Sequence, residues 1–88
     1  MTYQVTIAPS AARQLQERLP EAVAWACFEF IHGPLAEEPG RVGAPLRSPY
    51  ADHWRARRGE YRVRYIIDDD AKVVTVLDID HRRDAYHR

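Results

Sequence analysis

The sequence predicts an α+β fold in a single domain, with two helices packed on one face of a four-stranded sheet. Three observations carry this prediction. The chain has 88 residues, enough for one hydrophobic core. Apolar residues recur at helical spacing in the first half and alternate with the two-residue period of strands in the second half. Segregated helices and strands favour a helical layer on one face of a sheet, which leaves the other face free.

The first half of the chain predicts one strand and a helical hairpin. Residues 2–7, TYQVTI, alternate like a half-buried strand. Ser10 is expected to cap a first helix, which ends at Pro20, and a second apolar stripe predicts the second helix. Residues 34–50 are rich in proline and glycine, so we expect an irregular connection there, anchored to the core by Leu46.

The second half predicts three antiparallel strands joined by short turns. Residues 59 and 60 form one tight reversal, and the three aspartates from residue 68 form the next. The β-branched segment 72–79 predicts a central strand that is covered on both faces. On the free face, the alternation gathers basic side chains from two neighbouring strands, namely His53, Arg55, Arg57, Arg62 and Arg64.

The net charge of zero hides an uneven distribution. Residues 41–65 hold seven arginines against two acids, and the balancing acids are expected on the helical hairpin and at the turn of residues 68–70. Guanidinium groups bind phosphate in a planar fork, and adjacent ones repel unless an anion lies between them. We therefore favour a phosphate-bearing partner over the alternative of a solvated edge protected by charge.

Other function classes are excluded by composition. A single cysteine, Cys27, allows neither an internal disulfide nor a Cys-rich zinc site, and the four histidines share no metal-ligand spacing. No metal or cofactor is therefore expected. No apolar window is long enough to cross a membrane, and the start does not resemble a signal peptide, so we expect a soluble cytoplasmic protein with no membrane partner.

Several motifs spread over nearly the whole chain carry a family resemblance. They are PSAA at residues 9–12 with Leu15, Leu19-Pro20 between the helices, GAPL at residues 43–46, the run WRARRGEYRVRY at 54–65 and DHRRDAY at 80–86. The most specific part is R-x-G-x-Y-R-x-x-Y followed by H-R-x-x-x-Y. In these features the chain resembles the RelE/ParE superfamily of toxins from type II toxin-antitoxin systems, and the RelE branch in particular.

The resemblance implies an endoribonuclease that works without a metal, enters the ribosomal A site, cuts mRNA there and inhibits translation. It also implies a RelB-like antitoxin from an adjacent gene and a toxin-antitoxin hetero-oligomer that binds operator DNA through the antitoxin. Family roles in catalysis transfer to Arg55, Arg62, Arg82 and Tyr86, and His53 becomes a candidate general base because it stands where a well-known member has lysine. The candidate contacts to RNA or phosphate are Arg57, Arg58, Arg64, Arg83 and His81.

The residue chemistry is compatible with this reaction. RNA supplies its own nucleophile, the 2′-hydroxyl, so a guanidinium cluster can stabilise the extra charge of the phosphorane without a pair of acids. We expect Arg62 and Arg82 at the scissile phosphate. Two alternatives stay open: a ParE-like toxin that inhibits DNA gyrase by binding it, and a non-catalytic RNA-binding module.

Overall fold

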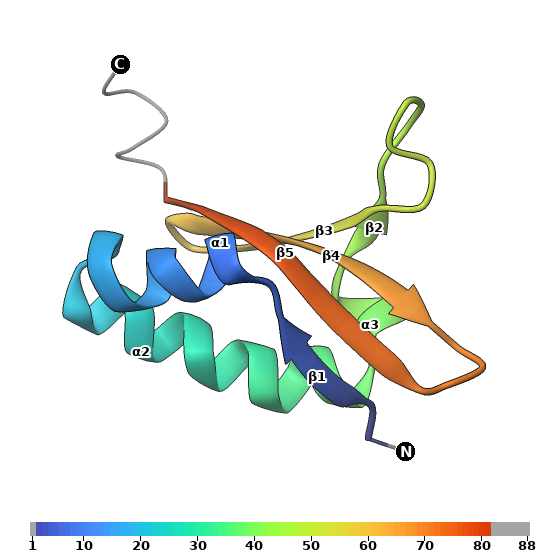
Figure 1. Cartoon of the computed structure of the whole chain (residues 1–88), viewed down its shortest axis with the longest axis horizontal. Helices are drawn as coiled ribbons and strands as arrows, with labels where there is room; N and C mark the ends of the chain where they lie inside the picture. Colours follow the sequence, from blue (N-terminus) through green and yellow to red (C-terminus); the bar gives the residue numbers. More distant parts are fainter. Residues whose placement is uncertain (1, 82–88) are drawn as a thin grey trace.

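A five-stranded sheet runs across two helices in the computed structural model, which describes residues 2–81 (Figure 1). The strand order is β1-β5-β4-β3-β2, where β1 and β5 are parallel and all other neighbours are antiparallel. The predicted α+β class is confirmed, but the prediction of four strands is wrong. The strands are β1 (Gln4–Ile7), β2 (Ala44–Pro45), β3 (Trp54–Arg58), β4 (Tyr61–Asp68) and β5 (Val73–His81).

The additional strand is β2, a short edge strand that pairs with the start of β3. Pro45 lacks an N–H group and is therefore tolerated at a sheet edge. For the same reason, a proline in a short segment argues against a strand, so the sequence did not predict β2. The next N–H group, that of Leu46, donates to the carbonyl oxygen of His53 at 2.8 Å. Leu46 is only half-buried, and the buried Leu35 and Pro39 fix this part of the chain instead.

The predicted helical hairpin is confirmed and covers one face of the sheet (Figure 1). Ser10 does not cap the first helix: the cap position is Ala8, and the Ser10 hydroxyl donates to the carbonyl oxygen of Leu77 at 2.8 Å, which ties the helix to β5. No helix among residues 2–81 is long and apolar enough to cross a membrane. The helical segments are α1 (Pro9–Arg13) continued by the π-helical η1 (Gln14–Arg18), α2 (Glu21–Phe30) continued by η2 (Ile31–Leu35), and α3 (Pro39–Val42).

The hydrophobic core lies between the helices and the sheet. Val63 and Tyr65 of β4 are fully buried, and the Tyr65 hydroxyl donates to the carbonyl oxygen of Pro39 at 2.6 Å. Because side chains alternate along a strand, burial of these two residues turns Arg62 and Arg64 to the opposite face. The largest fully buried side chains are Tyr65, Ile31, Leu35, Ile79, Val63, Val74, Val76 and Cys27.

Candidate nucleic-acid interface

Four arginines of β3 and β4 share the face of the sheet that the helices leave open. In the antiparallel register, Arg55 stands opposite Arg64 and Arg57 stands opposite Arg62. Directly opposed side chains in such a ladder are roughly 5 Å apart at Cβ, so the four guanidinium groups start from neighbouring positions. The predicted convergence is confirmed, and we call these four residues the arginine face.

Two aspartates of β5 lie next to the arginine face, on the same side of the sheet. Arg64 donates to Asp78 at 2.6 Å, and the Arg62 guanidinium lies 3.8 Å from the Asp80 carboxylate. The expectation that the balancing acids lie on other surfaces is therefore wrong for this pair. The alternation Asp78-Ile79-Asp80 was the signal that could have placed them, because a buried Ile79 turns both neighbours to the open face.

The two ion pairs leave the arginine face with unmatched positive charge. Among the described residues, Arg55 and Arg57 form no ion pair. Partly exposed pairs such as Arg64 with Asp78 stabilise a fold by only about 1 kcal/mol or less, but they hold a long side chain in one orientation. Two arginines are thus ordered by carboxylates, while two remain free to meet an anion.

A cavity of about 330 Å³ lies over the arginine face. The cavity is lined by Arg47 and by three arginines of the arginine face, Arg57 being the one that does not line it, and together with two carboxylates these four guanidinium groups leave a net charge of +2. Sequence reasoning did not select Arg47 and Tyr50, because only the folded connection between β2 and β3 brings them here. The cavity is lined by Leu46, Arg47, Tyr50, Arg55, Arg62, Arg64, Asp78 and Asp80.

His53, the candidate general base, lies beside this cavity. Its ring centroid is 5.5 Å from that of Tyr50, and it is half-buried just before β3 begins. Its Nδ1 atom is buried and has no hydrogen-bond partner among residues 2–81. The structure therefore brings His53 to the edge of the arginine face, next to an aromatic ring.

Among residues 2–81, no three His, Cys, Asp or Glu side chains gather closely enough to hold a metal ion.

Two predicted phosphate contacts do not belong to the arginine face. The guanidinium carbon of Arg58 lies 4.8 Å from the ring centroid of Phe30, on the helical side of the sheet. His81 is 2% exposed, and its Nε2 atom approaches a Glu60 oxygen at 3.4 Å without hydrogen-bond geometry. Strand alternation explains both placements, since Arg58 and His81 pair with the buried Tyr61. Arg82, Arg83 and Tyr86 lie outside the described residues.

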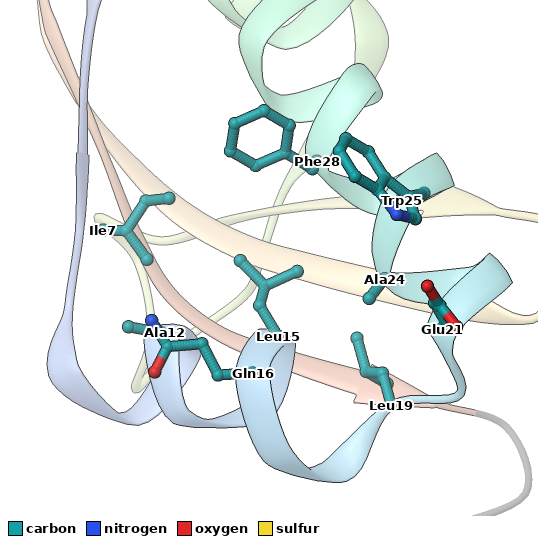
Figure 2. Close-up of a pocket in the computed structure, with 9 residues that line it drawn as sticks. All are labelled: Ile7, Ala12, Leu15, Gln16, Leu19, Glu21, Ala24, Trp25 and Phe28. Atoms are coloured by element: carbon teal, nitrogen blue, oxygen red, sulfur yellow. The ribbon is translucent and has the colours of Figure 1, made fainter.

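A second, apolar surface lies on the helical side of the molecule (Figure 2). It is a groove of about 480 Å³ in which α2 presents Trp25 and Phe28. These side chains are 61% and 44% exposed, and their rings meet edge to face with centroids 6.2 Å apart. Exposed apolar grooves are typical of sites that contact another protein, a membrane or a small ligand. The lining residues are Ile7, Ala12, Leu15, Gln16, Leu19, Glu21, Ala24, Trp25 and Phe28.

Comparison of the sequence with known proteins gives consistent matches. A family model described as the ParE toxin of the type II toxin-antitoxin system parDE matches residues 3–86. The chain is 49% identical to Toxin RelE of Mycobacterium tuberculosis over 84 residues, which cover 96% of this chain and 86% of that protein. It is 46% identical to Toxin RelG of the same organism over 88 residues and the full length of both.

Solved structures match the fold as well. The toxin-antitoxin complex RelBE2 of M. tuberculosis contains a chain that is 44% identical, with a TM-score of 0.90 over 93% of this chain and 100% of that chain. The archaeal RelE-RelB complex from Pyrococcus horikoshii contains one that is 31% identical, with a TM-score of 0.71 over 93% and 97%. The fold and the family match together define a toxin of a type II toxin-antitoxin system. The chain belongs to the ParE toxin family, and within it to the RelE-like toxins.

Proposed function

We propose that this toxin is an endoribonuclease that cuts mRNA in the ribosomal A site and thereby inhibits translation. The observation that carries the proposal is the arginine face with its open cavity of net charge +2. Phosphoryl transfer in RNA concentrates negative charge on the phosphorane oxygens, and fixed guanidinium groups stabilise that charge. The names of the relatives, Toxin RelE and RelG, support the same class of protein.

The proposed reaction uses the 2′-hydroxyl of the RNA as the nucleophile. Its oxygen forms a new bond to phosphorus while the bond from phosphorus to the 5′-oxygen breaks, which leaves a 2′,3′-cyclic phosphate and a 5′-hydroxyl. Arg62, and Arg82 beyond the described residues, would bind the scissile phosphate, and Arg55 and Arg57 the flanking ones. His53 would accept the 2′-hydroxyl proton. Tyr86 would return a proton to the leaving 5′-oxygen, or would stack on a base, in which case water would supply that proton.

We also propose a RelB-like antitoxin as the partner of this toxin, encoded by an adjacent gene. Support comes from the RelBE2 and RelE-RelB complexes, whose toxin chains share 44% and 31% identity with this one. An acidic or amphipathic antitoxin segment would cover the arginine face or pack beside the helical hairpin, where Trp25 and Phe28 are exposed. The hetero-oligomer would bind operator DNA through the antitoxin, and the toxin would act in the cytoplasm.

The test is brief expression of the toxin in cells, followed by mapping of mRNA 5′ ends. The wild-type chain should cut at fixed positions within translated codons. Arg55→Ala should lose most of these cuts because it removes a phosphate contact from the arginine face. Arg58→Ala is the matched control and should retain these cuts. It removes an equal charge from the same strand, but on the helical side beside Phe30.

Two outcomes would contradict the proposal. Intact mRNA together with gyrase-linked DNA damage would favour the ParE-like alternative. Salt-dependent RNA binding by the purified toxin, with no cut product in cells or on ribosomes, would favour the RNA-binding module.

A further inference from the structure

The connection between β2 and β3 holds one aromatic ring beside the arginine face. Its ends are joined by the hydrogen bond from the Leu46 N–H group to the His53 carbonyl oxygen, at 2.8 Å. Within it, Tyr50 donates its N–H to Arg47 at 2.9 Å, and His53 donates to the carbonyl oxygen of Tyr50 at 2.9 Å. In Figure 1 this connection projects away from the two helices. Backbone hydrogen bonds thus position Tyr50 independently of the core.

Tyr50 is half-exposed, in contrast to the tyrosines of β4. It is 49% exposed, whereas Tyr61 and Tyr65 are buried at 7% and 0%. The guanidinium carbon of Arg64 lies 5.6 Å from the Tyr50 ring centroid, and the His53 ring is tilted by 32° to it. The ring also lines the arginine-face cavity. Packing in the core does not explain this aromatic side chain, but its position beside phosphate-binding groups suggests a use for it.

We propose that Tyr50 is a stacking platform for an unpaired nucleobase of the RNA whose phosphates bind the arginine face. This inference rests on the proposed function and extends it to the recognition of the base. Single-stranded nucleic acids are bound where a positive groove follows the backbone and an aromatic ring stacks on a base. Tyr50 supplies the ring, and Arg64 with Arg55 supplies the positive groove in the same cavity. The neighbouring guanidinium of Arg64 also restrains the ring through a cation–π contact.

The platform defines the class of substrate. A base inside a duplex is already stacked and paired, so only an unpaired stretch can place a base on Tyr50 while its phosphates reach the arginine face. Every base has a π-face, so stacking on a tyrosine tolerates different bases. Tyr50 would therefore select single-stranded RNA without selecting a sequence.

Binding of short oligonucleotides to the purified full-length toxin tests the platform. The probe is a fluorescent single-stranded 2′-O-methyl oligonucleotide, which lacks the attacking hydroxyl and stays intact. Tyr50→Ala should weaken its binding by about tenfold or more, since loss of one stacked base costs that much. Tyr50→Phe keeps the ring and should bind like the wild type. Phe28→Ala, which removes an exposed aromatic side chain from the distant apolar groove, should also leave the affinity unchanged.

Abasic probes separate stacking from an indirect effect through Arg64. At one position along the probe, removal of the base should weaken wild-type binding by the same factor and should cost Tyr50→Ala nothing further. The proposal is overturned if Tyr50→Ala binds as tightly as the wild type, or if the wild type binds no probe. It is also overturned if Tyr50→Ala weakens the binding of every abasic probe as much as it weakens the binding of the intact probe. If the effects of Tyr50→Ala and of base removal are not additive but the toxin cuts no RNA, the stacking platform is upheld and the proposed cleavage is refuted. If the toxin cuts RNA but the two effects are additive, the cleavage is upheld and the platform is refuted.

Discussion

The two faces of the sheet place opposite demands on neighbouring residues. On the helical side, Val63 and Tyr65 are fully buried, and the Tyr65 hydroxyl is bonded to a backbone carbonyl. On the open side, Arg62 and Arg64 of the same strand are about one-third exposed and face carboxylates. One step along β4 therefore separates a residue that holds the fold together from one that can bind a ligand.

The two faces also differ in how they respond to pH. Burial raises the pKa of Cys27, Tyr61 and Tyr65 to about 12, so these three groups of the helical side remain uncharged near neutrality. Guanidinium groups remain protonated throughout the same range. Neither set can exchange a proton near neutral pH. The proposed general base must therefore be another group, and His53 lies beside the cavity.

The sharpest test of this comparison uses two consecutive residues of β4. Arg62→Ala should lower the rate of RNA cleavage about 100-fold or more, the usual cost of removing one donor to a developing oxyanion. It should change the free energy of unfolding by only about 0.5 kcal/mol, because its pair with Asp80 at 3.8 Å is partly exposed. Single-turnover cleavage and urea unfolding measure the two quantities.

Val63→Ala is the counterpart on the helical side. It removes two buried methyl groups and should lower the free energy of unfolding by about 2 kcal/mol. Its cleavage rate, measured where the variant is fully folded, should stay within about threefold of the wild type. If both variants lost stability and activity to the same extent, the separation of the two faces would be refuted.

The second test concerns the contact between the two sides at Gly43. A Cβ atom there would overlap the Tyr65 hydroxyl and lie 2.8 Å from the Arg55 carbonyl oxygen. Gly43→Ala should therefore cost about 1–3 kcal/mol of stability and also displace Arg55, so activity should fall even where the protein is folded. Thermal unfolding and cleavage assays check this expectation.

Gly33→Ala provides the matched control for Gly43→Ala. Its Cβ would meet no atom within 4 Å, and the position is helical, so stability should be unchanged or rise by up to about 1 kcal/mol. Equal effects of the two substitutions would show that backbone freedom, and not the close approach at Gly43, sets the cost.

The sequence predicted the arginine face because alternate side chains along a strand point to opposite faces of the sheet. Arg55 and Arg57 alternate with Trp54 and Ala56, and such alternation leaves one choice of face once the apolar partners are buried. The acids Asp78 and Asp80 obey the same rule, but the β-branched run before them suggested a strand covered on both faces. A local pattern is reliable where it alternates cleanly and ambiguous where it does not.

Other features depended on contacts between distant segments. The strand β2 exists because Ala44 and Pro45 lie against the start of β3, and Tyr50 reaches the cavity through hydrogen bonds within its own connection. No periodicity in the sequence encodes either arrangement. Ser10 had a suitable sequence for a helix cap, but it lies inside α1 and its hydroxyl donates to the carbonyl oxygen of Leu77 in β5. Tertiary contacts decided these cases.

The smallest expected effect comes from the buried hydroxyl of the helical side. Tyr65→Phe removes the 2.6 Å hydrogen bond to Pro39 and should cost about 1 kcal/mol at pH 7 in urea unfolding. The pKa of Tyr65 is raised by burial from 10.0 to about 12, so the unfolded chain releases this proton at lower pH than the folded protein. Its contribution to stability is complete below pH 10 and is lost as the pH rises to about 12.

Tyr65→Phe should therefore lose less stability than the wild type between pH 10 and 12. The decline should become shallower without disappearing, because burial also raises the pKa of Tyr61 and Cys27 to about 12. Tyr50→Phe, on the half-exposed ring of the open side, is the matched control and should leave the stability at pH 7 unchanged. An unchanged slope in Tyr65→Phe would mean that the Tyr65 hydroxyl does not contribute to alkaline unfolding, and would refute the expected effect of its raised pKa.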